Sequence, residues 1–270
     1  MVYILPDSIL ITHKFPDRKD ISIYAIADVH LGAKECMEQE FMKFIKMVEE
    51  TPDVYLILVG DLLNNATKSS VSNVFDDVYR PSEQKKIMAE ILRPVKDRIL
   101  CAIPGNHEDR SGKDVDDDLM YDIMAKLDIE ERYRKNVAVV KLKMGDNQKR
   151  HGSNNPVYTF AVVHGNGGGV MTGGGVNKAE RYAYTFEGID ALITAHTHKP
   201  LITTPSKIRV DHQRNVTRQV PFDVIFATSW LRHSDYAARK MLFPTSHVFQ
   251  KIHLSGTKKE ITVSTKHSYD

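Results

Sequence analysis

Five short apolar runs in the first two hundred residues constrain the fold of this chain most strongly. Each run is rich in β-branched or aliphatic residues and stops abruptly at turn residues. The runs are Ile21–Ala27, Val54–Val59, Ile99–Ile103, Thr159–Val163 and Ala191–Ala195. Continuous apolar runs of this length are typical of strands that are buried on both faces. The sequence therefore predicts a sheet whose central strands are covered on both sides.

Helical patterns lie between the first of these runs. We expect helices over Glu38–Glu49, Glu83–Val95 and Val115–Leu127. Strands that alternate with helices indicate βαβ units and a largely parallel sheet.

After about residue 137, strand-like segments joined by Gly, Asn, Pro and Ser turns dominate. The expected strands are Val137–Met144, Val157–Val163, Leu201–Thr204, Ile208–Val210, Asn215–Val220, Val224–Thr228, His247–Leu254 and Glu260–Ser264. This pattern predicts a second, more antiparallel sheet that packs on the first. The sequence shows no internal repeat and no linker rich in Pro or Ser, so we expect a single domain over residues 1–270.

The composition excludes several classes of protein. With 37 Lys and Arg against 35 Asp and Glu, a net charge of +2 and 41% hydrophobic residues, the chain is unlike a disordered protein. No apolar run approaches the roughly 18–20 residues of a membrane helix, so we expect no membrane partner. Two cysteines, Cys36 and Cys101, cannot form a disulfide framework. The opening MVYILPDSIL lacks the basic and apolar regions of a signal peptide, and we expect a cytoplasmic protein.

The near-neutral charge argues against coating of nucleic acid by charge alone, although one local groove would be enough to bind it. Two stretches are locally basic, Lys141–His151 and Lys207–Arg218. We interpret both as hairpin turns with solvated side chains, with a phosphate-tracking surface as the alternative. The glycine-rich segment Gly165–Gly175 is expected to be a loop that either approaches a ligand closely or is plain surface.

Polar side chains follow all five apolar runs. Ligands bind at the carboxyl ends of the strands in open α/β sheets, so these side chains should converge if the strands are neighbours. They are Asp28, His30, Asp61, Asn106, His164, His196 and His198. A mixed set of nitrogen and oxygen ligands suits Mn, Fe or Zn better than Ca or Mg. Seven ligands are too many for one tetrahedral ion, and the pattern predicts a pair of metal ions.

The order of these blocks resembles the calcineurin-like metallophosphoesterase family. The blocks are Asp28-x-His30, Gly60-Asp61, Gly105-Asn106-His107-Glu108, His164 and His196-x-His198, and together they span residues 28–198. The resemblance implies an α/β fold in which two mixed β-sheets pack face to face with helices outside, a four-layer α/β/β/α sandwich. It also implies two divalent metal ions, with Mn expected first and Fe or Zn as alternatives.

The resemblance also assigns roles to the ligands. Asp28, His30 and His198 would hold the first metal, and Asn106, His164 and His196 the second. Asp61 would bridge the two through one carboxylate oxygen to each. A metal-bridging hydroxide would then be the nucleophile.

The resemblance places His107 beside the substrate, where it would contact the phosphate and protonate the leaving oxygen. Family members often carry an Asp three residues after the bridging Asp to orient this histidine, and this chain has Asn64. An amide can hold the ring but cannot stabilise imidazolium, so Asp109 is an alternative partner and Asn64→Asp is expected to maintain or raise activity. Ala195 stands where the family usually has Gly, which implies a small backbone adjustment.

Further residues are candidates for substrate contact: Asn64, Arg181, Arg232 and His233. Tyr182 and Tyr184 alternate beyond the glycine-rich segment, and we expect them to pack in the core, with stacking on a base as the alternative.

The motifs Asp28-Val29-His30-Leu31-Gly32 and Gly60-Asp61-Leu62-Leu63 resemble the Mre11/SbcD-like nuclease branch. That branch carries a capping domain, whereas the 72 residues after His198 are expected to finish the second sheet. The resemblance implies a metal-dependent phosphoester hydrolase, foremost a phosphodiesterase or nuclease acting on DNA, RNA or a nucleotide. The alternatives are a phosphomonoesterase, a cyclic-nucleotide phosphodiesterase and a catalytically silent scaffold. No protein partner is indicated.

Overall fold

The strands form two mixed sheets and a separate two-stranded hairpin. The computed structural model describes residues 9–68, 70, 74–145, 155–167, 171–233, 237–238, 241–244 and 246–267. The first sheet has the strand order β13-β12-β2-β3-β4, and the second has the order β1-β5-β6-β7-β11-β8. The strands are β1 Leu10–Phe15, β2 Asp20–Ile26, β3 Val54–Leu58, β4 Ile99–Ala102, β5 Ala138–Met144, β6 Val157–Val162, β7 Ala191–Thr194, β8 Leu201–Thr203, β9 Ser206–Asp211, β10 Val216–Pro221, β11 Asp223–Phe226, β12 Val248–Ser255 and β13 Ile261–His267.

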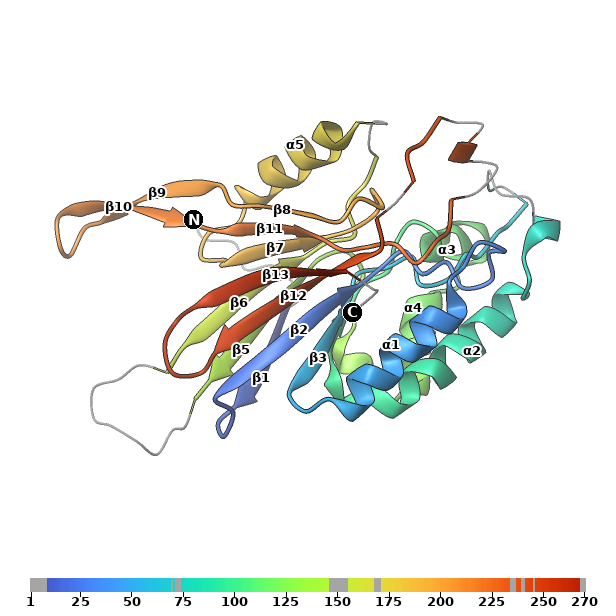
Figure 1. The fold of residues 1–270 in the computed structure, drawn as a ribbon, viewed down its shortest axis with the longest axis horizontal. Helices are drawn as coiled ribbons and strands as arrows, with labels where there is room; N and C mark the ends of the chain where they lie inside the picture. Colours follow the sequence, from blue (N-terminus) through green and yellow to red (C-terminus); the bar gives the residue numbers. More distant parts are fainter. Residues whose placement is uncertain are drawn as a thin grey trace.

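The helices cover the outer faces of the two sheets (Figure 1). The α-helices are α1 Glu38–Glu50, α2 Pro81–Leu92, α3 Glu108–Val115, α4 Leu119–Lys126 and α5 Thr172–Ala183. Short 3-10 helices span Val74–Asp76, Arg93–Arg98 and Glu130–Arg132. Helices α1, α2 and α4 share a core with the first sheet, and α5 shares one with the second.

Successive side chains of the central strands pack alternately in the core between the sheets and in the core beneath the helices. On β2, Ile23 and Ala25 point into the core between the sheets, whereas Tyr24 and Ile26 point toward the helices. Successive side chains of a strand point to opposite faces, so a continuous apolar run fills both cores. The structure confirms the expected class: two mixed sheets face to face, with helices outside.

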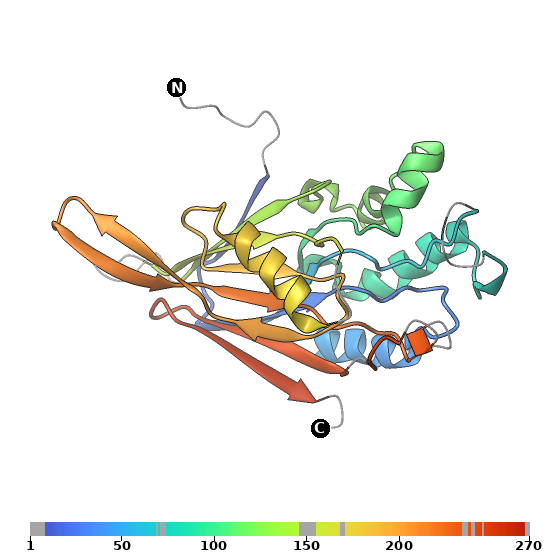
Figure 2. The same cartoon turned by 90° about the horizontal axis from the view of Figure 1, so that it is seen from above.

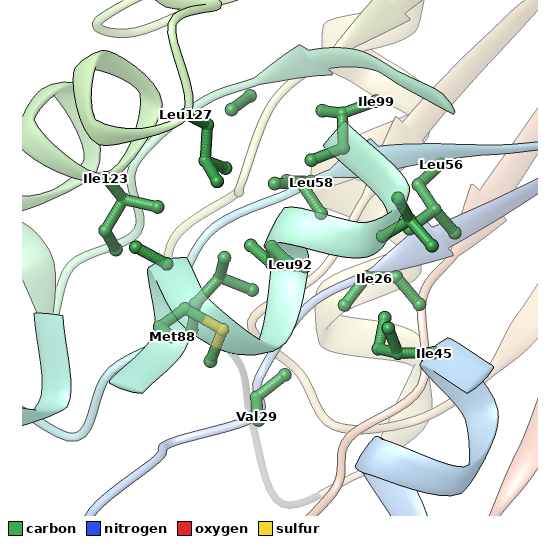
Figure 3. Packing of buried hydrophobic residues seen from close by; sticks show 14 of the residues in the cluster. Ile26, Val29, Ile45, Leu56, Leu58, Met88, Leu92, Ile99, Ile123 and Leu127 are labelled. Carbon is green, nitrogen blue, oxygen red and sulfur yellow. The ribbon is translucent and has the colours of Figure 1, made fainter. Parts of the chain in front are cut away.

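Helix α1 shows how the sequence directs this packing. Its buried residues Phe41, Phe44, Ile45 and Val48 recur at helical spacing and form one apolar face. Figure 3 shows Ile45 of this face beside Ile26 and Leu56 of the first sheet, with Met88 and Leu92 of α2 nearby.

The five apolar runs are divided between the two sheets and are therefore not all neighbours. Strands β2, β3 and β4 are parallel neighbours in the first sheet, while β6 and β7 are parallel neighbours in the second. The carboxyl ends still meet across the two sheets, because the His164 ring after β6 contacts the carbonyl of Val59 after β3.

The expectation that the segment after His198 finishes the second sheet is wrong in part. Strands β8 and β11 do join that sheet, but β12 pairs antiparallel with β2 and β13 pairs with β12 in the first sheet. The alternating apolar side chains Ile252 and Leu254 of β12 are fully buried between the sheets, which explains why this strand covers the edge of β2.

Three local boundaries also differ from the predictions. Helix α2 ends at Leu92, and a 3-10 turn continues over Pro94, which has no amide hydrogen to donate. The helix expected over Val115–Leu127 begins only at Leu119. Asp116 ends α3 with a left-handed φ of 56°, and Asp118 caps α4 by accepting a hydrogen bond from Tyr121 N. Helix α5 begins at Thr172, inside the segment expected to be a glycine-rich loop, of which residues 168–170 lie outside the described residues.

The second basic stretch forms the predicted hairpin. Strands β9 and β10 pair antiparallel, with Ser206 opposite Pro221 at one end and Asp211 opposite Val216 at the other. The hairpin extends away from the two sheets (Figure 2). The corresponding turn of the first basic stretch, from residue 146 onward, lies outside the described residues. Over the part of the chain that the structure describes, no helix is both long and apolar enough to cross a membrane.

Candidate metal centre

Left-handed backbone conformations mark the loops that follow the strands. Five of the predicted ligands have positive φ angles: Asp28 49°, His30 50°, Asp61 52°, His196 69° and His198 55°. Positive φ is uncommon outside glycine, and a strained residue costs roughly 1–3 kcal/mol unless its surroundings enforce it. Strain concentrated at these residues indicates that the backbone is bent to aim their side chains.

Two glycines and a buried glutamate join the loops after β3 and β4. A Cβ on Gly60 would collide with the backbone of Gly105, and a Cβ on Gly105 would collide with the carboxylate of Asp61. The carboxylate of Glu108 accepts hydrogen bonds from the amides of Asp61 and Gly105 at 2.8 Å and from Leu63 at 2.9 Å. Burial and the charge of Asp61 raise the pKa of Glu108 to about 7. Glu108 therefore fixes both loops relative to each other.

The first group of candidate ligands is Asp28, His30 and His198. The His196 amide donates to Asp28 Oδ2 at 3.1 Å, which leaves Asp28 Oδ1 facing the histidines. That oxygen lies 3.3 Å from His198 Nε2 and 3.9 Å from His30 Nε2, and the two Nε2 atoms are 3.4 Å apart. Three potential ligand atoms thus converge on one point.

The second group is Asp61, His164 and His196. The His164 Nδ1 atom lies 2.6 Å from the carbonyl of Val59, a contact in which the nitrogen donates, so Nε2 is the ring atom that could bind a metal. His164 Nε2 lies 3.2 Å from Asp61 Oδ2. Burial lowers the pKa of His164, but the adjacent negative charge of Asp61 outweighs burial and raises it to about 10. The negative charge that attracts this proton would equally attract a metal cation.

Asp61 lies between the two groups. Its Oδ1 atom accepts a hydrogen bond from the His107 amide at 2.8 Å. Its Oδ2 atom lies 4.0 Å from His30 Nε2 and 3.2 Å from His164 Nε2. Oδ2 is therefore the Asp61 oxygen that faces both histidines.

The residues present fit a pair of divalent cations. In each of three groups, Asp28–His30–His198, His30–Asp61–His107 and Asp61–His164–His196, the ligand atoms lie within 4.8 Å of one another. Asp28 Oδ1 and His164 Nε2 are buried and have no hydrogen-bond partner among the described residues. A buried polar atom without a partner is costly, and a metal ion bound at each group would provide a partner for the atom in that group. Asn106, the remaining predicted ligand, is exposed and lines the same cleft as His164.

His107 lies at the edge of this cluster in a network that the sequence did not reveal. Its Nδ1 is 2.7 Å from the carbonyl oxygen of Asn64, and its Nε2 is 2.9 Å from the guanidinium of Arg110. Because a guanidinium only donates, Nε2 accepts and Nδ1 carries the proton. Burial lowers the pKa of His107 against the opposing effect of Asp61, and Arg110 lowers it further.

The expected role of the Asn64 side chain is wrong, because its main-chain carbonyl holds His107 instead. The side-chain amide donates to Asp77 Oδ1 at 2.6 Å. An Asp at position 64 would confront Asp77 with a second carboxylate, so we no longer expect Asn64→Asp to be neutral or activating.

Of the other substrate candidates, one lies in the cleft beside the cluster. Arg181 lines it, whereas Arg232 bonds to Glu40 of α1 at 2.9 Å and His233 is exposed and outside the lining. Tyr182 and Tyr184 were expected in the core, but they are 40% and 50% exposed. Tyr182 is in the last turn of α5 and lines the cleft, and Tyr184 follows the helix and packs edge-on against Phe222.

Sequence reasoning missed Glu108 and Arg110 as site residues. Glu108 was part of the recognised motif but was given no role. Arg110 follows His107 by three residues at the start of α3, and this spacing places two side chains on the same helix face. That spacing was the available signal.

Comparisons with known proteins agree with this arrangement. The sequence model of the family described as calcineurin-like phosphoesterase matches residues 21–200. No curated protein matches the sequence.

Among solved structures, a conserved uncharacterized protein and predicted phosphoesterase from Streptococcus pneumoniae TIGR4 is 10% identical, with 92% of this chain and 90% of that chain covered and a TM-score of 0.41. The NAD nucleotidase of Haemophilus influenzae is 9% identical, with coverage of 91% and 49% and a TM-score of 0.35. A 5′-nucleotidase precursor from Thermus thermophilus is 10% identical, with coverage of 92% and 54% and a TM-score of 0.38. The chain spans about half the length of the two nucleotidases.

Proposed function

This chain belongs to the calcineurin-like phosphoesterase family and is a metal-dependent phosphoester hydrolase; from that premise we propose that it is a phosphodiesterase or nuclease. The observation that carries the proposal is the position of Asp61 Oδ2 between two groups of Asp and His ligand atoms. The family binds two divalent metal ions, and these two groups offer a place for each.

We assign Asp28, His30 and His198 to one ion. His164 and His196, together with Asn106, would hold the other, and Asp61 would bridge them. Mn²⁺ is the first expectation, with Fe or Zn as alternatives, because the ligands are mixed imidazole and carboxylate. When bound, a metal pair stabilises charge on the phosphoryl group and lowers the pKa of water.

The protein's own side chains then position the ester. Arg110 places a fixed positive charge beside His107 Nε2, where it would bind a phosphate oxygen. His107 is held by Asn64 through Nδ1. Its Nε2 accepts from Arg110 in the structure, so it would protonate the leaving oxygen only after Arg110 turns to the phosphate and Nε2 takes up a proton from water.

The cleft beside the second group favours a diester over a monoester. It has a volume of about 700 Å³ and begins at Asn106 and His164. A phosphodiester carries a substituent on both sides of phosphorus, and a cleft of this size accommodates the second one. A monoester has no second substituent to fill it.

We further infer that residues 1–270 form a single cytoplasmic domain. One core of buried side chains joins the two sheets, which supports one folding unit. Cys36 and Cys101 are both free thiols, as a reducing compartment favours.

The proposal is tested by hydrolysis of bis-p-nitrophenyl phosphate beside p-nitrophenyl phosphate. Metal-stripped protein is assayed with and without added Mn²⁺, and bound metal is measured by elemental analysis. We expect Mn²⁺-dependent hydrolysis, faster on the diester, with two ions per chain. The matched variant Asp61→Asn should bind fewer ions and lose turnover, because it removes the negative charge of the carboxylate that lies between the two groups.

Three outcomes count against the proposal. Hydrolysis of the monoester alone would indicate a phosphomonoesterase. Two bound ions with no hydrolysis of either ester would favour the silent scaffold. Full metal binding by Asp61→Asn would refute the assigned bridge.

A further inference from the structure

The cleft beside the metal centre carries more positive charge than one phosphodiester needs. Its charged lining residues are Lys135, Lys178 and Arg181 against one carboxylate, Asp109. Accepting the proposed function, we propose that the substrate carries a second phosphate and that this phosphate lies in the cleft against Lys178 and Arg181. The substrate class is then a nucleotide-type phosphodiester with a further phosphate.

Helix α5 holds these two cations at a fixed place relative to the metal ligands. A Cβ on Gly175 would lie 2.6 Å from Thr197 Cγ2, so the glycine allows the helix to pack directly on the residue between His196 and His198. Lys178 and Arg181 follow on the same helix at a spacing of three, which places them on one face. Both line the cleft.

Lys178 also reaches across the segment that follows His164. Its Nζ donates to the carbonyl of Gly167 at 3.5 Å, and Gly167 has a φ of 51°. A Cβ at Gly167 would lie 2.8 Å from the same Nζ, so glycine leaves room for the ammonium group. The ammonium group therefore lies against Gly167, three residues after the candidate ligand His164, and both residues line the same cleft.

The rest of the lining suits the nucleoside that would join two phosphates. Its lining includes the apolar side chains of Val163, Ala179 and Phe226. Tyr182, which is 40% exposed, also lines the cleft. A volume of about 700 Å³ is in the range of pockets that bind molecules of nucleotide size. An apolar lining flanked by cations favours a nucleotide over a purely apolar ester or a bare polyphosphate.

The test compares two chromogenic esters that differ only in the second phosphate. They are thymidine 5′-(p-nitrophenyl phosphate) and the same ester with a 3′-phosphate. In both, water adds to phosphorus, the bond to the nitrophenyl oxygen breaks and p-nitrophenolate leaves. Charge-assisted hydrogen bonds are strong, and we expect the 3′-phosphate to raise kcat/KM roughly tenfold to a hundredfold.

The variant Lys178→Gln/Arg181→Gln should remove most of that advantage, lowering kcat/KM far more for the bisphosphate ester than for the other. The control Lys43→Gln/Lys86→Gln makes the same charge change at exposed positions of α1 and α2, and it should preserve the ratio. Equal kcat/KM for the two esters in the unaltered protein would overturn the proposal. An equal loss on both esters in the variant would do the same.

Failure of the proposed function is recognised separately. If the Mn²⁺-loaded protein hydrolyses neither ester, the phosphodiesterase assignment fails, and the cleft is tested by calorimetric binding of thymidine 3′,5′-bisphosphate against thymidine 5′-phosphate. Tighter binding of the bisphosphate that is lost in Lys178→Gln/Arg181→Gln supports the second-phosphate site, and equal binding refutes it. Competition by a ten-residue oligothymidylate against the bisphosphate then separates a nucleic-acid strand from a free nucleotide as the source.

Discussion

Replacing Glu108 by Gln tests how firmly the loops after β3 and β4 are joined. Glu108 is 2% exposed, and its two oxygens accept hydrogen bonds from three main-chain amides. Two of these amides, Asp61 and Gly105, share Oε2, while Leu63 bonds to Oε1. Gln keeps one oxygen and places an NH2 group where the other was, so at least one amide meets a donor in place of an acceptor.

The size of the effect follows from these contacts. A hydrogen bond to a charged group contributes about 1.5–3 kcal/mol, and a buried donor left unpaired costs about 1–3 kcal/mol. The net loss is smaller than this sum, because burial and the charge of Asp61 destabilise the charged form of Glu108 and raise its pKa to about 7. The neutral Gln does not carry that cost. With Gln oriented to keep the two bonds at Oε2, we expect a net loss of about 2–4 kcal/mol in the free energy of unfolding.

Urea unfolding measures this loss through the single tryptophan, Trp230, which is buried against Phe41 and Phe44. Calorimetry with Mn²⁺ reports whether the Asp61 loop still presents its ligand. The control Glu49→Gln makes the same chemical change at an exposed position of α1 and should alter stability by less than about 0.5 kcal/mol. A change below about 1 kcal/mol in Glu108→Gln, with unchanged Mn²⁺ affinity, would refute the reasoning.

Further predictions concern the residues beside the cluster and the thiols. His107→Ala should keep both metal ions by elemental analysis and lower kcat on bis-p-nitrophenyl phosphate about 10²–10⁴-fold; loss of metal would show that it is a ligand instead. Arg110→Ala should lower kcat/KM about 10–100-fold with partial rescue by Arg110→Lys, and an unchanged rate would remove Arg110 from the site. Burial raises the pKa of Cys36 to about 12 and also raises that of Cys101, so both thiols should react with a disulfide reagent at pH 8 much faster in denaturant than in the native protein. Rapid labelling in the native protein would contradict the burial of Cys101 and the raised pKa of the half-buried Cys36.

The groups of candidate ligands could be predicted from the sequence because the pattern that indicates them is local. An apolar run followed by Asp or His places the side chain at the end of a strand, and six of the seven predicted ligands fall into the three groups. The assignment of strands to sheets was less accessible. The runs at β3 and β6 are both short and mainly apolar, and nothing within either run indicates which neighbouring strand it pairs with.

The supporting contacts could not be predicted for a related reason. Glu108 joins loops that are more than forty residues apart in the sequence, through backbone amides that any residue offers. The carbonyl of Asn64, rather than its side chain, holds His107, so the residue type at position 64 carried no information on this bond. Spacing along the chain identifies side chains on one strand or helix, but not the backbone atoms that meet them.

The pairing of the late strand β12 with the early strand β2 has a consequence for biosynthesis. Strands β2, β3 and β4 emerge early from the ribosome, yet β12, which covers the open edge of β2, is made only after β11. The nascent chain must therefore keep an unpaired, apolar strand edge exposed while most of the protein is translated, and such edges promote aggregation. A truncated chain ending before Val248 would retain every predicted metal ligand and still lack the strand that closes the first sheet.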